Sequence, residues 1–302
     1  MQGIRFDGTF RLTVYYQGAV LMQFSNPNVN FNIDFDADIV KDGFKNGNTR
    51  NSIFIYNLSS DKRNTLQALI SESRQTSMQF MIEVSIPYME DQFEVITYDD
   101  IVGVYSELGE SDYKTQLILK SGEASAIEQY SSVSFPPGAT LSQVMNLECQ
   151  SLVDGDSITN FNTQNMQDHT FPYGIAYVGN TFSQIKKLAY EYNNTAFIDK
   201  GVLYIAQNNW IPVSNQVIQQ LNYSNGLLES PTVGQANYSK KYNLNQGAVA
   251  FQFKTLILPT VNINDVLNVM GVYFTIKRIS HTINSREGIA YSVMEGYQND
   301  AV

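Results

Sequence analysis

The stretch VAFQFKTLILPTVNINDVLNV, from Val249 to Val269, indicates how the last third of this chain is built. Residues 249–254 alternate between two faces, which is the period-2 pattern of a β-strand. An apolar corner, Leu256–Pro259, follows, and because proline lacks a backbone N–H it fits a strand end better than a ladder interior. A second strand and a hairpin that turns at Asn284–Gly288 come next. The pattern predicts a β module over residues 225–302.

The first third of the chain also has the pattern of β-strands. Residues Val29–Ile39 read VNFNIDFDADI and alternate without a fault, so apolar side chains fall on one face and Asp34, Asp36 and Asp38 on the other. We expect a long, half-buried strand with an acidic outer stripe. A helix is predicted after Ser59 and Ser60, which can cap it. Further strands are expected at residues 10–16, 51–58, 78–86, 93–105 and 113–119.

The middle of the chain has a different character, typical of a small α+β unit. Thr140–Gln143 and Thr181–Gln184 each fit the capping box, in which a Thr hydroxyl and a Gln side chain satisfy backbone donors at a helix start. After the second helix, a short hairpin is predicted to turn at Lys200–Gly201. Residues Ser151–Tyr173 are expected to be a loose surface segment. The single cysteine, Cys149, is expected to be buried on the first helix.

Several of these features together resemble a known family. The order of a strand, the Leu256–Pro259 corner, the Ile263–Asp265 entry and a final hairpin resembles the last barrel of the baseplate hub proteins of phage contractile tails. These are related to the hub part of secretion-system spike proteins. Residues 53–58 (IFIYNL) before a helix, and 99–107 (DDIVGVYSE) later, resemble the first barrel of that family, and Gly226–Pro231 resembles its lead-in to the second.

The resemblance implies a mainly β (α+β) fold with two tube-like β-barrels and an inserted domain. The implied domains are 1–122 (first barrel), 123–224 (inserted α+β domain) and 225–302 (second barrel). It also implies a homotrimeric ring whose six barrels adapt a six-fold tail tube to a three-fold central spike. Expected partners are the tail tube protein and the spike protein, and further candidates are the tape measure protein and baseplate wedge proteins. The expected location is the virion tail baseplate, after assembly in the host cytoplasm.

Composition and charge narrow the possible functions. The net charge is −10 with a pI near 4.7, and Lys and Arg occur without a basic cluster. Proteins that bind nucleic acid for affinity need such clusters, so no sequence-specific nucleic-acid binding is expected. Charged residues make up 16%, below the roughly 25% that is typical, which suits large polar interfaces. One cysteine excludes an internal disulfide framework, and no apolar run predicts a membrane span.

No catalytic or metal-binding motif stands out, so the prediction is a structural protein without cofactor, not an enzyme. His281 falls in a strand and is expected to be structural, and His169 falls in a loop and receives no role. The acidic pairs Glu90–Asp91 and Asp99–Asp100 are expected to be solvated at the surface, although a glycosidase would use two carboxylates about 5–10 Å apart. Trp210 is expected to serve packing.

The acidic strand then has an expected use. DNA has to slide through a tail channel without binding, and a lumen of Asp and Asn side chains repels phosphate. We therefore expect Asp34, Asp36 and Asp38 to line the DNA channel of the hub. Two alternatives stay open at this point: a host-glycan-binding module with an aromatic cleft near Trp210, and a cell-wall-degrading tail module with two carboxylates in one cleft.

Overall fold

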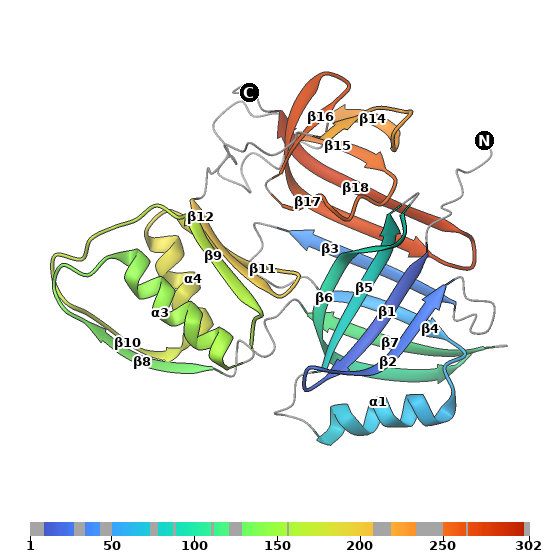
Figure 1. The fold of residues 1–302 in the computed structure, drawn as a ribbon, viewed down its shortest axis with the longest axis horizontal. Coiled ribbons are helices and arrows are strands. Elements are labelled where there is room, and N and C mark those ends of the chain that lie inside the picture. Colours follow the sequence, from blue (N-terminus) through green and yellow to red (C-terminus); the bar gives the residue numbers. More distant parts are fainter. Residues whose placement is uncertain are drawn as a thin grey trace.

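The protein is described by a computed structural model, which places residues 9–26, 34–42, 50–72, 78–86, 89–109, 112–120, 129–155, 157–207, 219–233, 250–263 and 265–298. The described chain is mainly β with three helices (Figure 1). It has one large sheet, almost entirely antiparallel, and two small sheets. The prediction of a mainly β fold with a smaller α+β part is therefore confirmed.

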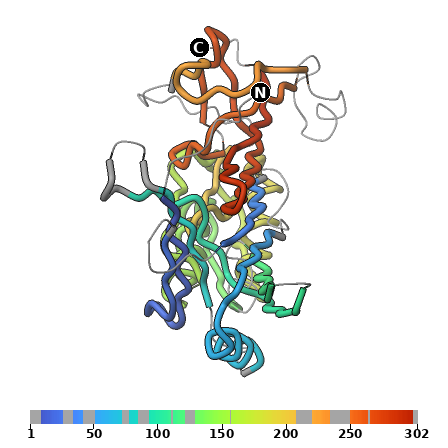
Figure 2. Tube along the Cα trace, turned by 90° about the vertical axis from the view of Figure 1, so that its right-hand side faces the viewer, coloured from blue at the N-terminus to red at the C-terminus, as the bar shows by residue number. Residues whose placement is uncertain are grey.

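We call the first part of the chain the first β module. Its strands pair in the order β3-β4-β7-β6-β5-β1-β2, all antiparallel. Helix α1 (Ser60–Glu72) packs at the end of the molecule opposite β14 and β16 (Figure 2). The strands are β1 (Phe10–Tyr16), β2 (Ala19–Asn26), β3 (Phe35–Asp42), β4 (Arg50–Tyr56), β5 (Met78–Ile86), β6 (Met89–Leu108) and β7 (Tyr113–Lys120).

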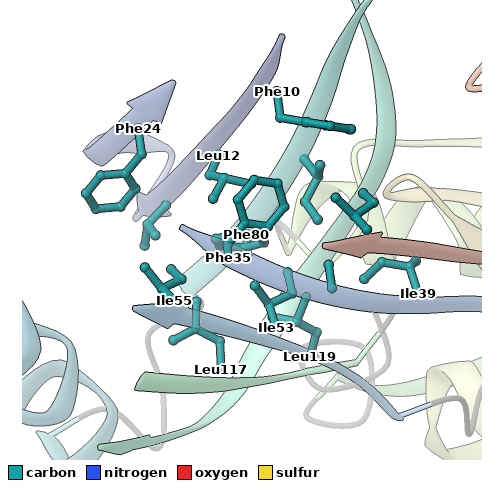
Figure 3. Packing of buried hydrophobic residues seen from close by; sticks show 14 of the residues in the cluster. Phe10, Leu12, Phe24, Phe35, Ile39, Ile53, Ile55, Phe80, Leu117 and Leu119 are labelled. Carbon is teal, nitrogen blue, oxygen red and sulfur yellow. The ribbon is translucent and has the colours of Figure 1, made fainter. Parts of the chain in front are cut away.

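Alternation along these strands produces the core of the first β module. Phe35, Ile39 and Phe80 are at most 1% exposed, and they meet apolar side chains from the neighbouring strands (Figure 3). Successive side chains of a strand point to opposite faces, so one face of each strand enters this core while the other stays outside. Each fully buried Ile or Phe contributes about 1.5–3 kcal/mol relative to exposure.

The last part of the chain forms the second β module, and its final hairpin extends into the first. One edge of β17 pairs along its length with β18, and the other pairs first with β16 and then with β3 over Arg278–Asn284. Ile283 and Ala290, near the tip of this hairpin, therefore belong to the core of the first β module. The strands are β13 (Gln219–Leu221), β14 (Leu227–Val233), β15 (Ala250–Thr255), β16 (Val266–Val269), β17 (Val272–Asn284) and β18 (Ile289–Gln298).

The large sheet is therefore continuous across both β modules. It contains 13 strands and runs from β14 at one end to β2 at the other. Within the described residues no pairing joins these two ends, so no closed barrel is present there. The core of the second β module is separate and includes Phe253, Phe274 and Met294.

The middle module has three layers. Helices α3 (Leu141–Asp154) and α4 (Thr181–Glu191) lie between a two-stranded ribbon and a three-stranded sheet (Figure 1). Their apolar sides form a core of their own with Phe171 and Leu203. The ribbon pairs β8 with β10, and the sheet has the order β11-β12-β9. These strands are β8 (Tyr130–Phe135), β9 (Asn160–Asn165), β10 (Ile175–Asn180), β11 (Asn194–Asp199) and β12 (Val202–Gln207).

Several local predictions are confirmed. Thr140 caps α3 through a complete capping box with Gln143, and Cys149 is fully buried on that helix. The predicted hairpin exists as β11 and β12, and its turn has positive φ at both Lys200 (53°) and Gly201 (77°). Two-residue turns with positive φ at both central residues match the twist of the strands that they join.

Three local predictions are wrong. The second helix is capped by Asn180, whose side chain accepts from Ser183 N–H, and Thr181 is already its first helical residue. The segment Ser151–Tyr173 is not loose, since it includes the end of α3 and strand β9. The pair Asp99–Asp100 is buried instead of solvated, because the side chains of Thr97 and Asn51 donate to the Asp99 carboxylate at 2.7 and 3.2 Å.

Candidate assembly face and module junctions

The outer face of the large sheet is a surface that the two β modules share. In register across it lie Asn284 of β17, Asp36 of β3, Phe54 of β4 and Gln116 of β7. The opposite face of the same strands carries the buried cores, so these side chains point away from them. We call this surface the assembly face.

The predicted acidic stripe lies on this face. Asp38 is exposed, while Asp34 and Asp36 are partly buried. Asp34 pairs with Arg286 at 3.1 Å, Asp36 accepts a hydrogen bond from the Tyr56 hydroxyl at 2.6 Å, and Asp38 accepts from the Thr282 hydroxyl at 3.2 Å. Burial and the Asp36 carboxylate together raise the pKa of Tyr56 to about 12, so the phenol stays a donor.

Opposite charges balance most of the acidity around the stripe. Arg278 pairs with Glu295 at 3.3 Å, and Lys254 pairs with Glu229 at 3.5 Å. Lys114 lies over the Phe54 ring, 3.9 Å from its centroid. The assembly face is therefore polar and aromatic, and the carboxylates on it without a cationic partner in these contacts are Asp36 and Asp38.

At the tip of the C-terminal hairpin, one arginine adds side-chain contacts to the backbone pairing of β17 with β3. Arg286 donates to Asp34 and to Asp112 (2.7 Å), and its guanidinium lies 3.9 Å from the centroid of the Tyr56 ring. Asn57 also donates to Asp112, and together with Arg286 it lowers the pKa of that carboxyl. We call this solvent-accessible group the arginine clamp. It holds residues that are far apart in sequence on one face.

A second junction is buried and joins all three modules. Lys41 of β3 pairs with Asp199 of β11 at 3.0 Å, with side chains only 7% and 10% exposed. Next to Asp199, Lys200 donates to the Pro259 carbonyl at 2.9 Å. Burial lowers the pKa of Lys200 to about 8, and burial raises the pKa of nearby Asp265. We call this group the buried junction.

Apolar contacts support the buried junction. Phe197 of β11 belongs to the core of the second β module and stacks on Tyr204 with ring centroids 5.4 Å apart. Gly201 at the hairpin turn lies so close to Tyr98 of β6 that an added Cβ would stand 3.0 Å from that ring. The hairpin β11–β12 is thus the element by which the middle module contacts both β modules.

The remaining candidate residues do not form a reactive centre in the described chain. His281 is 1% exposed, its Nδ1 lies 2.8 Å from the Ser292 hydroxyl, and burial lowers its pKa, which fits the structural role that was predicted. His169 stacks on Tyr192 at 4.5 Å. Trp210 lies outside the described residues, as do the side chains of Glu90 and Asp91. No three His, Cys, Asp or Glu side chains gather as metal ligands in the described ranges. None of the described helices combines the length and apolar character of a membrane span.

Known structures provide a comparison for the whole chain. No protein-family model matches it, and neither does the sequence of any curated protein. The tail protein from Neisseria meningitidis MC58 matches with a TM-score of 0.54 at 9% identity, over 97% of each chain. The 43 kDa tail protein of prophage MuSo2 from Shewanella oneidensis matches with a TM-score of 0.56 at 11% identity, over 95% of this chain and 97% of that one.

A secretion-system protein has the same arrangement. The E. coli c3393 protein, a component of the type VI secretion system with structural similarity to the T4 tail proteins gp27 and gp5, matches with a TM-score of 0.55 at 8% identity. The match covers 95% of this chain and 77% of that chain. This chain therefore has the fold of phage tail proteins and of a related secretion-system component, over nearly its full length.

Proposed function

We propose that this chain is the structural hub of a phage tail baseplate. Three copies form a ring that adapts the six-fold tail tube to the three-fold central spike and surrounds the DNA channel. The observation that carries the proposal is the fold match to tail proteins, which spans both β modules and the middle module together. A match of one module alone would be compatible with many functions.

The arrangement of the sheet supports a ring. At one end of the large sheet, the outer edge of β2 pairs with no described strand. Such an edge can pair with a strand of a neighbouring subunit, and head-to-tail contacts of this kind form a ring when the rotation between subunits closes. In this proposal residues 1–122 and 225–302 are two tube-type β domains, 123–224 is inserted between them, and the final hairpin connects the two β domains.

The assembly face is the proposed wall of the channel. It is continuous across both β modules, its side chains are polar and aromatic, and the predicted stripe of Asp34, Asp36 and Asp38 lies on it. Because most nearby charges are paired, the wall would repel phosphate mainly through Asp36 and Asp38 and would otherwise offer DNA few contacts. Neighbouring parts of the tail, including the tape measure and wedge proteins, would contact the remaining surfaces.

The test is reconstitution with the neighbouring tail products. The chain should form a complex of three copies, measured as three times the 34.0 kDa chain mass by light scattering, when mixed with the tube and spike proteins. Electron microscopy of that complex should place β3 at the lumen. A monomer that binds neither partner would contradict the hub role, and a trimer with β3 on its outer surface would contradict only the channel assignment.

The lumen assignment has its own variant. Asp38→Lys should leave the complex intact but slow DNA passage in assembled particles, because it adds a cation to the wall. Tyr190→Lys, at a 78% exposed position on α4 of the middle module, is the matched control and should leave DNA passage unchanged.

A further inference from the structure

The ribbon β8–β10 is the layer of the middle module that lies opposite its contact with the β modules. The hairpin β11–β12 on one side of the helices makes that contact through Asp199, Lys200 and Phe197. The ribbon covers the other side of the helices and extends away from the large sheet (Figure 1). One layer of the module is therefore used for docking within the chain, while the opposite layer faces outward.

The hydrogen-bond register shows which backbone groups of β8 point outward. Thr181 N–H donates to the Gln129 carbonyl at 2.9 Å, and Tyr130 lies opposite Asn180. Bonded and non-bonded pairs alternate in an antiparallel ladder, so the bonds to β10 are made by residues 131, 133 and 135. The N–H and C=O groups of Tyr130, Ser132 and Ser134 point to the other edge, where no described strand pairs with them.

The side chains on the outer side of this ribbon are uncharged. Tyr130 is 76% exposed and Val178 is 83% exposed, and Ser132 lies directly opposite Val178. Neither strand contains a charged residue or a proline. The edge strand β14 differs, because it contains Glu229 and Pro231 and its ladder with β15 is irregular at both. Charges, prolines and irregular pairing are the usual means by which proteins protect an edge strand, and β8 has none of them.

We propose that the free edge of β8 binds an extended segment of a partner protein by strand addition. The outward backbone groups of β8 belong to every second residue and therefore repeat every ~6.6–6.8 Å. Another extended backbone has donors and acceptors at the same spacing, so it can pair with this edge. The uncharged side chains of β8 beside this edge, Tyr130, Ser132 and Ser134, favour a segment with uncharged, β-branched side chains. This inference goes beyond the hub role and stands on the ribbon alone.

The test uses proline substitutions on the two edges of the same ribbon in the full-length chain. Ser132→Pro removes an outward N–H that makes no bond within the ribbon, so it should block an added strand without breaking the pairing with β10. Val178→Pro makes the same change on the opposite edge and is the matched control. Circular dichroism and thermal unfolding show whether each variant is folded. If a proline variant is unfolded, Ser132→Lys and its control Val178→Lys are used in place of the proline pair.

The probe is an array of overlapping peptides from the proteins encoded beside this chain, together with peptides of the chain itself. We expect neighbour-derived peptides to bind the unmodified protein and to lose at least about tenfold in affinity with Ser132→Pro but not with Val178→Pro. Equal binding by both variants, weaker binding only with Val178→Pro, or no bound peptide would overturn the proposal. Binding confined to peptides of the chain itself would overturn the partner assignment, because the occupant would then be a second copy.

Discussion

The arginine clamp and the buried junction both hold distant parts of this chain together with charged groups, but in opposite surroundings. In the clamp, Arg286 is 36% exposed and its partners Asp34 and Asp112 are 41% and 30% exposed. In the buried junction, Lys41 and Asp199 are 7% and 10% exposed. The clamp has two ion pairs and the buried junction has one, and the two sites differ most in their exposure to water.

This difference determines what each site can contribute. Water screens charges at the surface, and exposed pairs typically contribute about 0–1 kcal/mol. Removing a charge from water costs several kcal/mol, so a buried pair adds little net stability but becomes costly when one partner is lost. The clamp should therefore fix geometry at low energetic cost, while the buried junction should make the attachment of the middle module sensitive to any unpaired charge.

The largest effect is expected from breaking the buried pair. Lys41→Met leaves the Asp199 carboxylate buried without its ion-pair partner, and such a change typically costs about 3–5 kcal/mol. Urea unfolding should show this loss. Lys200 is close enough to interact with Asp199, so the effect is expected near the lower end of that range.

The double variant Lys41→Met with Asp199→Leu is the matched control for this prediction. With both charges replaced by apolar side chains, no unpaired charge remains, and stability should return most of the way to that of the unmodified protein. If Lys41→Met alone is as stable as the unmodified chain, the pair does not hold the middle module, and the contrast with the clamp disappears.

The second-largest effect is expected in the pH dependence of stability, and it also arises at the buried junction. The pKa of Lys200 is about 8 in the folded chain and 10.5 ordinarily, so between these values the unfolded chain binds more protons. Stability should therefore rise as pH increases from about 8, with a slope of at most about 1.4 kcal/mol per pH unit for this lysine. Lys277, whose pKa is also about 8 because of burial, adds a rise of the same sign.

Lys200→Met separates the two lysines. Between pH 8 and 9.5, a range below the ordinary tyrosine pKa of about 10, the slope should be less positive than in the unmodified chain. Lys277 and the buried Cys149, whose pKa is raised by burial and whose effect has the opposite sign, contribute equally to both chains. Lys187→Met, at a surface lysine that is 72% exposed, should leave the slope unchanged. An identical slope in Lys200→Met and the unmodified chain would show that Lys200 is solvated.

Elements with strong alternation were predictable from the sequence alone. β5 spans Met78–Ile86 as predicted, and its buried residues Met78 and Phe80 are the apolar members of the pattern. The weakly apolar strands were not predictable. β9 reads NFNTQN and pairs in parallel with β12, and β8 reads YSSVSF, so neither gives an alternating signal. Their position is set by the helices and sheet around them.

Contacts between residues that are far apart in the chain could not be predicted from the sequence either. Asp99 is buried because Asn51, 48 residues away, donates to it, and an acidic pair carries no sign of such a partner. The register of β17 with β3 likewise joins residues 244 apart, such as Thr282 and Asp38. Asp36 and Asp38 lie on one face of β3 as the alternation predicted, whereas Asp34 precedes that strand and the predicted part at residues 29–33 lies outside the described chain. The contacts of the stripe with Arg286 and Tyr56 were not visible in the pattern.

The smallest effect is expected at the arginine clamp. Arg286→Gln removes two ion pairs and the stacking on Tyr56, yet all of these groups keep access to water, so the loss should be at most about a quarter of that for Lys41→Met. The loss should shrink further in 1 M salt, where the Debye length is about 3 Å, whereas the loss in Lys41→Met should hardly change. Arg286→Lys keeps the charge but not the planar fork that reaches both carboxylates. Its stability should therefore lie between that of the unmodified chain and that of Arg286→Gln. Unfolding of all three variants at low and high salt measures the comparison directly. If Arg286→Gln costs as much as Lys41→Met and resists salt, the clamp is shielded from water, and exposure does not explain the difference between the two junctions.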